Sequence, residues 1–198
     1  MLDAEELSDL PATFTTGEAL RAGVHPRDLY RLRDRGDLTE LSRGVFRRAD
    51  APVPRYPDLL AVARRVPQAV VCLTSALALH DLTDDIPAAV HIAVPRTSRP
   101  PHIDHPPTEV SRFGVDTFEL GVELVEAAEG EHVRVYSAPR TVVDVFRLRA
   151  RLGESTALIA LRRYLAGRDA RVGDLVEFAR ALHVAAPLRA ALDVLTAS

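Results

Sequence analysis

The chain has 198 residues, of which 47% are hydrophobic, and its 25 basic and 28 acidic side chains give a formal net charge of −3. This length is typical of one medium-sized domain, or of a small domain joined to a larger one. All 25 basic residues are arginine, which excludes mechanisms that need a lysine: a Walker A phosphate loop, a Schiff base, a kinase strand lysine or a carboxylate-x-Lys nuclease core. A single cysteine, Cys72, excludes an intrachain disulfide and a multi-cysteine metal site.

The hydrophobic residues are spread along the chain. No apolar run approaches the roughly 18 residues that a membrane-spanning helix needs, and no charged-then-apolar leader opens the sequence. We therefore expect a soluble cytoplasmic protein without a membrane partner.

Charge is segregated along the sequence. Residues 21–48 carry eight arginines and four acidic residues, a local charge of +4. Residues 132–171 carry nine arginines and three acidic residues, a local charge of +6. Residues 1–20 and 116–131 contain acidic residues but no arginine. Two basic segments thus alternate with acidic ones, which the net charge conceals.

The first 50 residues are predicted to form three helices and a hairpin. Pro26 suits the first position of the third helix, and Gly36 ends that helix. The expected elements are a helix at 5–10, a helix at 17–21 capped by Thr15 or Thr16, a helix at 26–35, and strands at 38–41 and 45–48.

This pattern is typical of a winged helix-turn-helix, in which the third helix reads the major groove and the hairpin follows the neighbouring backbone. Leu29 and Leu32 lie on one side of the third helix, and the opposite side carries Arg27, Tyr30, Arg31 and Asp34. The candidate DNA-binding residues are Arg27, Tyr30, Arg31 and Arg35 on the helix and Arg43, Arg47 and Arg48 on the wing. The alternative is a winged helix used for protein contacts, with its arginines merely solvated.

Three prolines in residues 51–57 predict a stiff linker between domains at residues 1–50 and 58–198. The second part mixes element types and ends in helices, so the predicted class is α+β: a winged helix-turn-helix followed by a larger α+β domain that ends in a helical bundle. The expected elements are helices at 56–65, 74–80, 139–152, 156–166, 172–183 and 186–195, and strands at 70–73, 90–94, 109–113, 122–125 and 132–136.

The helix at 139–152 presents a polar stripe at helical spacing: Arg140, Asp144, Arg147 and Arg151. One interpretation is a solvated stripe in which Asp144 pairs with a neighbouring arginine. The other is a second basic surface for the DNA backbone or an acidic partner, which Arg162, Arg163, Arg168 and Arg171 extend. The sequence leaves both open.

Histidines provide a weaker signal. His102 and His105 flank a carboxylate, with His91 on a nearby strand, but the proline-rich loop offers no helix to set zinc geometry. We expect a surface loop there, and no metal or cofactor.

Several stretches carry a resemblance to a known family. In the first 50 residues they are TTGEALRAGV (15–24), LYRL (29–32), RGDL (35–38) and SRGVFR (42–47). In the second part they are LTSALALHDL (73–82), VHIAVP (90–95) and SAPRTVVD (137–144). In this order, the stretches resemble the AbiEi-family antitoxins of type IV toxin–antitoxin systems.

The resemblance implies a non-enzymatic antitoxin that represses its own operon through the winged helix. It implies a nucleotidyltransferase toxin as the functional partner, with the second domain supplying the antitoxicity. Because one recognition helix spans few base pairs, we expect operator DNA with inverted repeats, bound by two copies as a homodimer on DNA. The alternatives are an enzyme that modifies the toxin covalently as an atypical phosphotransferase, or a DNA-binding regulator without a toxin partner.

Overall fold

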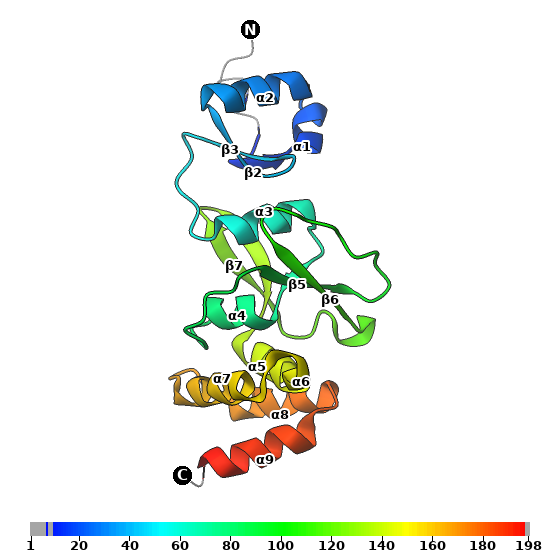
Figure 1. Cartoon of the computed structure of the whole chain (residues 1–198), viewed down its shortest axis with the longest axis vertical. Coiled ribbons are helices and arrows are strands. Elements are labelled where there is room, and N and C mark those ends of the chain that lie inside the picture. Colours follow the sequence, from blue (N-terminus) through cyan, green and yellow to red (C-terminus); the bar gives the residue numbers. More distant parts are fainter. Residues whose placement is uncertain (1–6, 8–9, 197–198) are drawn as a thin grey trace. The chain divides into compact units, whose positions relative to one another are not determined.

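The computed structural model describes residue 7 and residues 10–196, and the chain divides into two compact units (Figure 1). The N-terminal unit comprises Met1–Gln68, His102–Thr108 and Glu126–Val133. The remaining segments, Ala69–Pro101, Glu109–Val125 and Arg134–Ser198, form the C-terminal unit. The N-terminal unit therefore extends beyond the proline-rich stretch and takes in two later segments. That residues 1–50 fold as a separate domain stays a prediction.

The first helix of the N-terminal unit begins at a capping box. Strand β1 (Thr13–Thr15) leads directly into α1 (Thr16–Arg21), and Thr15 is the N-cap. The Glu18 N–H donates to the Thr15 hydroxyl, and the Thr15 N–H donates to the Glu18 carboxylate. The predicted cap is confirmed. The helix expected at residues 5–10 falls largely outside the described residues.

Helix α2 (Pro26–Arg35) has the predicted bounds. Proline stands in its first turn, where the missing N–H costs no hydrogen bond. Gly36 ends the helix at a φ of 86°, a left-handed conformation that is costly for residues with a Cβ atom.

Three antiparallel strands complete the winged-helix core in the order β1-β3-β2, with β2 at Leu38–Ser42 and β3 at Val45–Arg48. Phe14 of β1 is the register partner of Phe46 of β3. Both rings are fully buried in one cluster with Leu29 and Leu32 of α2. The apolar side of α2 thus holds the helix against the sheet.

Helix α3 (Pro57–Arg65) contacts all three strands of this sheet. The two later segments are hydrogen-bonded into the same unit. The Tyr56 N–H donates to the Ala127 carbonyl oxygen at 3.1 Å, and the Ser42 hydroxyl donates to the His105 carbonyl oxygen at 2.5 Å. The sheet of the winged helix is therefore packed against residues well beyond position 50.

The second sheet has the strand order β6-β5-β4-β8-β7. Its strands are β4 (Val70–Val71), β5 (Val90–Pro95), β6 (Thr108–Phe113), β7 (Val122–Ala128) and β8 (Glu131–Tyr136), with the 3-10 turn η2 (Val115–Thr117) between β6 and β7. Strand β4 pairs antiparallel with β5 and parallel with β8. The joined ends of β7 and β8 are the segment Glu126–Val133 of the N-terminal unit.

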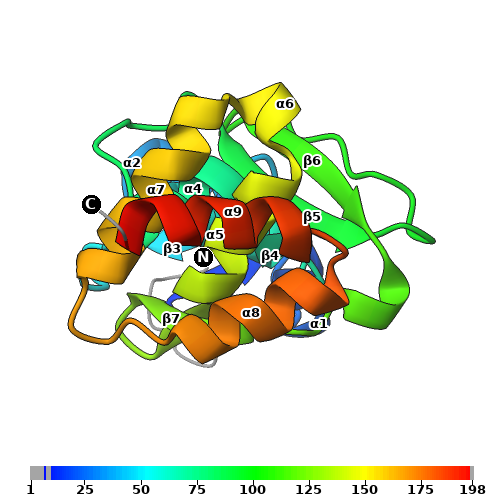
Figure 2. The same ribbon diagram turned by 90° about the horizontal axis from the view of Figure 1, so that it is seen from below.

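Among the described residues, the C-terminal unit contains six helices, and five of them follow β8, where the sequence predicts four. Figure 2 shows these helices from below. They are α4 (Leu73–Leu79), α5 (Ala138–Arg147), α6 (Arg149–Leu152), α7 (Glu154–Ala166), α8 (Val172–Ala181) and α9 (Ala185–Thr196). Helix α5 is central, in contact with α4, α7, α8 and α9. The predicted α+β class is confirmed. Within the described residues, no helix is both long and apolar enough to span a bilayer.

The single helix predicted over 139–152 is wrong, because α5 ends at Arg147 and α6 begins after Leu148. The Arg149 guanidinium donates to the Phe146 carbonyl oxygen at 2.9 Å, which satisfies one of the last carbonyls of α5 where the chain bends.

Candidate nucleic-acid interface

The outward face of α2 carries side chains suited to DNA. Because Leu29 and Leu32 are buried, Arg27, Tyr30 and Arg31 point away from the core and are exposed. The His25 ring nitrogen Nδ1 caps the helix by accepting a hydrogen bond from the Arg27 N–H at 3.2 Å. This cap fixes the first turn, the part of a recognition helix that meets base edges. The face borders a shallow hollow lined by His25, Arg27, Asp28, Tyr30, Arg31, Asp34 and Arg35.

Tyr30 is held in place by two neighbours. Its ring meets Phe46 edge-on, with centroids 5.8 Å apart, and the Arg33 guanidinium lies 4.9 Å from its centroid. Despite these two contacts, Tyr30 remains 40% exposed. The Tyr30 side chain is therefore held in position by its neighbours while part of it stays accessible to a ligand.

Glu40 connects α2 to the tip of the β2–β3 hairpin, the predicted wing. One of its carboxylate oxygens accepts a hydrogen bond from the Arg33 guanidinium at 2.7 Å, and the other accepts one from the Gly44 N–H at 3.1 Å. Gly44 has a φ of 74° and follows Arg43 at the tip of the β2–β3 hairpin. The tip of the wing is thereby tied to α2 through a single side chain.

The arginines of this surface differ in how they are paired. Arg27 and Arg43 are exposed and form no ion pair within the described part of the chain. Three other arginines of this surface each pair with an acidic residue: Arg31 with Asp28 at 3.1 Å, Arg35 with Asp37 at 3.1 Å and Arg48 with Asp50 at 3.2 Å. A guanidinium without a carboxylate partner is immediately available to a phosphate or a base edge. Arg27 and Arg43 are therefore the most available cations among the predicted residues.

The prediction that Arg47 lies on the exposed wing is wrong. Side chains alternate along β3, so Phe46 and Arg47 face opposite sides of the sheet, and Arg47 is 4% exposed. One guanidinium nitrogen donates to the Thr13 hydroxyl at 2.6 Å and to the Glu131 carboxylate at 2.5 Å. The other donates to the Pro52 carbonyl oxygen at 2.5 Å. Arg47 is therefore part of the buried polar network of the unit and does not lie on its exposed surface.

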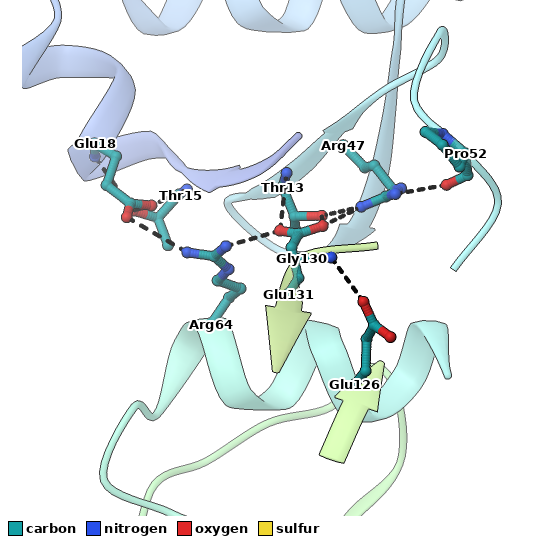
Figure 3. A network of polar contacts seen from close by, with 9 residues as sticks. All are labelled: Thr13, Thr15, Glu18, Arg47, Pro52, Arg64, Glu126, Gly130 and Glu131. Carbon is teal, nitrogen blue, oxygen red and sulfur yellow. Dashed lines mark hydrogen bonds and ion pairs between the residues drawn. The ribbon is translucent and has the colours of Figure 1, made fainter. Parts of the chain in front are cut away.

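Glu131 is the centre of this network (Figure 3). Its carboxylate also accepts hydrogen bonds from Arg64 of α3 at 2.7 Å and from the Thr13 N–H at 3.2 Å, and the residue is 8% exposed. Burial raises the pKa of Glu131, but the hydrogen bonds from Arg64, Arg47 and Thr13 outweigh it and hold the pKa below its ordinary value. Glu131 therefore stays ionised and binds α3 to the sheet.

The second basic surface does not exist as predicted, because Arg140 and Asp144 are both fully buried. Arg140 pairs with Asp144 at 2.9 Å and donates to the carbonyl oxygens of Thr117 and Leu120 at 2.8 and 2.7 Å. Its guanidinium also lies 4.4 Å from the Tyr136 ring centroid. Of the two interpretations left open, the pairing of Asp144 with its neighbouring arginines is present, but the Arg140–Asp144 pair is buried instead of solvated.

The remaining arginines of that prediction have separate environments. Arg147 pairs with Asp144 at 2.8 Å and lies 4.7 Å from the Phe113 ring centroid. Arg151 donates to the Ser111 hydroxyl at 3.2 Å, and Arg163 donates to the Asp84 carboxylate at 2.9 Å. Arg162 is exposed. These side chains do not form one continuous basic surface.

Sequence reasoning missed four residues that position the interface: Arg33, Glu40, Arg64 and Glu131. Glu40 stands four residues before Gly44, so a hairpin brace was visible in the sequence. The pairing of Arg47 with Glu131 joins residues 84 apart and left no local signal.

The chain is similar to known proteins in its N-terminal sequence and in its fold. Residues 4–49 match the family model described as "Transcriptional regulator, AbiEi antitoxin". None of the curated proteins gives a significant match. Among solved structures, the chain is similar to the crystal structure of the RV2827C protein from Mycobacterium tuberculosis, with a TM-score of 0.60 and 18% identity over 89% of this chain and 69% of that chain. At this identity, the likeness shows the fold alone. The resemblance predicted for the N-terminal segment is confirmed: residues 4–49 match the domain of AbiEi antitoxin transcriptional regulators.

Proposed function

We propose that this chain is a DNA-binding repressor of its own operon and the antitoxin of a type IV toxin–antitoxin system, acting in the cytoplasm. The observation that carries the proposal is the AbiEi match over residues 4–49, within which the capped helix α2 presents an exposed Arg27 that has no ion-pair partner in the described part of the chain. Helix α2 enters the major groove of the operator, and the Arg43 tip of the wing meets the neighbouring backbone.

The braced geometry supports this role. Base readout needs side chains held in place before the encounter, because ordering them on binding reduces the affinity. The edge-on packing of Tyr30 on Phe46 and the Glu40 bridge from Arg33 to Gly44 provide that order.

The partner in the proposal is a nucleotidyltransferase toxin, which the C-terminal unit counteracts without chemistry of its own. Its support is the family resemblance of residues 73–82, 90–95 and 137–144. Cells that produce the toxin are expected to grow when the full chain is co-expressed. Mass spectrometry of the toxin after incubation with the antitoxin and ATP is expected to find no added phosphate, and an added phosphate would favour the phosphotransferase alternative.

Binding to the DNA upstream of its own gene tests the repressor role. Fluorescence anisotropy is expected to show binding that weakens with salt, since arginine–phosphate contacts release counterions. The double variant Arg27→Glu/Arg43→Glu reverses the two arginines of this surface that form no ion pair among the described residues, and it is expected to abolish binding. Arg180→Glu changes an exposed arginine of α8 and serves as the matched control. Salt-insensitive binding, or equal effects of both variants, contradicts the proposal.

A further inference from the structure

An open apolar groove lies between α7 and α9 of the C-terminal unit, where α9 is the red helix of Figure 2. Its volume is about 670 Å³, and its lining includes Phe146 of α5, Leu158 and Ile159 of α7, and Ala190 and Ala191 of α9. Leu158 is 39% exposed and Ile159 is 50% exposed. Large apolar side chains gathered in one exposed groove mark an interaction surface more often than scattered ones do.

Both walls of the groove have helical spacing. The lining residues of α9 are at positions 187, 190, 191, 194 and 195, and those of α7 are at positions 154, 155, 158, 159 and 162. Such a groove matches the face of a third helix, which inserts apolar side chains between the two walls.

The charges on α7 show which helix fits. Glu154 and Arg162 line the groove at opposite ends, each four residues from Leu158, which is about 6 Å along the helix axis. The Glu154 side chain is 73% exposed, and its contact with Arg149 is long at 3.6 Å. Arg162 is exposed and forms no ion pair within the described residues. Within α7, the apolar centre is therefore flanked by one acidic and one basic residue, and Arg149 of α6 also lines the groove, at the Glu154 end.

This pattern is complementary to itself. When two copies of α7 pack antiparallel around a two-fold axis at Leu158, Glu154 of each copy faces Arg162 of the other. The apolar residues then meet at the centre, where water is excluded, and the charges lie at the rim. A purely acidic or basic partner helix satisfies only one of the two charges.

We propose that the groove between α7 and α9 binds a second copy of this chain, with each α7 lying antiparallel in the groove of the other copy. This inference goes beyond the proposed function, because the dimer forms without DNA and through the C-terminal unit. In a DNA-binding protein, it supplies the two recognition helices that an inverted repeat needs.

Sedimentation velocity of the full chain, from low micromolar to several hundred micromolar concentration, tests the proposal. The wild type is expected to shift from monomer to dimer. Ile159→Glu and Ala190→Glu each place a charge in the apolar contact, and each is expected to raise the dissociation constant at least about tenfold. Both positions are on exposed turns of helices, so circular dichroism is expected to show unchanged folding. Ile86→Glu, at a residue that is 94% exposed outside the groove, is the control.

A charge swap tests the antiparallel register. Glu154→Arg alone and Arg162→Glu alone place like charges opposite each other and are expected to weaken the dimer. The double variant Glu154→Arg/Arg162→Glu restores opposite charges across the axis and is expected to recover the dimer. Recovery identifies this register, because a purely local effect of either substitution is not repaired by the other.

Other outcomes overturn the proposal. They are a chain that stays monomeric at every concentration, a dimer that Ile159→Glu and Ala190→Glu leave unchanged, and a double swap without recovery. If hydrogen exchange in residues 154–162 slows only when another protein or a small molecule is added, the groove has a different occupant. Because the assay contains no DNA, its failure is distinct from a failure of DNA binding.

Discussion

At the scale of single residues, the arginines of α2 differ in what they lose on meeting DNA. Arg27 gives up only water, whereas Arg31 also gives up its contact with Asp28 at 3.1 Å. In the proposed complex with DNA, Arg27 is therefore the first candidate for base readout, because it lies in the first turn of α2, the part of a recognition helix that meets base edges.

We expect Arg27→Ala to weaken operator binding by about 1–3 kcal/mol and to reduce the preference for operator over random DNA. Arg31→Ala is expected to weaken operator binding less, because the wild-type Arg31 side chain already forms an ion pair with Asp28. Fluorescence anisotropy titrations on both DNAs measure the difference. Equal losses on operator and random DNA would assign Arg27 to a phosphate contact instead.

Glu131 is the second residue with a distinct prediction. We expect Glu131→Gln to lower the free energy of unfolding by about 3 kcal/mol at pH 7, because it leaves Arg47 buried beside a neutral group. Urea denaturation measures this, with Glu126→Gln, an exposed neighbour on the same segment, as the control.

The pH dependence of that difference follows from the lowered pKa of Glu131. A carboxyl whose pKa is lower in the folded state stabilises the fold above its unfolded pKa, near the ordinary value of 4.5, and loses this effect as the pH falls through the folded pKa. The gap between the wild type and Glu131→Gln is therefore expected to narrow below about pH 4.5. A gap that stays constant down to about pH 3 would show that Glu131 does not act through its charge.

At the scale of elements, the sequence predicts what local signals determine. The Thr15 cap, Pro26 and Gly36 set the helix ends, and the strands of the hairpin lie within a residue of their predicted bounds. Strand β1 was missed because three residues carry too little periodicity.

Which side of an element is buried is decided by partners that are distant in sequence. Arg47 was expected on the DNA-contacting wing, but α3 packs against the hairpin strands and Arg47 is buried. Likewise, the stripe on α5 has the spacing of a solvated face, and only the packing of α4, α7 and α8 around α5 shows it to be buried. No spacing rule within one element carries that information.

The wing has an exposed arginine at its tip, Arg43, and a buried one, Arg47, and the proposed function gives them separate expectations. Arg43→Ala is expected to reduce the log–log salt slope of DNA binding by about 0.9, the effect of one lost phosphate contact. Arg48→Ala is expected to change it less, because Arg48 already pairs with Asp50 at 3.2 Å. Arg47→Ala is expected to lower the free energy of unfolding measured in urea. The salt slope of DNA binding by the folded variant is expected to stay close to that of the wild type. An Arg43→Ala slope equal to the wild type would remove the wing tip from the interface.

For α5, the buried pair predicts a non-additive response. Asp144→Ala is expected to destabilise the chain by about 3–5 kcal/mol, because it leaves Arg140 charged and fully buried. The double variant Arg140→Met/Asp144→Leu removes both charges and is expected to cost less than Asp144→Ala alone. Urea denaturation of the single and double variants measures the coupling. Additive losses would indicate that the pair contributes nothing as a pair.

At the scale of the whole molecule, the N-terminal unit is assembled from three separate segments of the chain. A winged helix of about 50 residues has a small core, and such domains are marginal unless other elements add to them. Here α3 and the segment Glu126–Val133 extend the small winged-helix core, and Arg64 of α3 and Glu131 of the segment are joined by a hydrogen bond. The proline-rich stretch joins α3 to the winged helix within one unit.

A fragment of residues 1–57 tests whether this addition is needed. It retains α2 and the wing tip but lacks Glu131 and Arg64, so Arg47 keeps only Thr13 and the Pro52 carbonyl oxygen as partners. We expect the fragment to unfold at a lower urea concentration than the full chain and to bind operator DNA only weakly. Arg47→Met removes the uncompensated charge, and in the fragment it is expected to raise stability, whereas in the full chain it breaks the Glu131 network and lowers stability. This opposite sign isolates the role of Glu131 from a general effect of truncation. A fragment as stable as the full chain, with the same operator affinity, would show that residues 1–50 fold and function alone and that the later segments only pack against them.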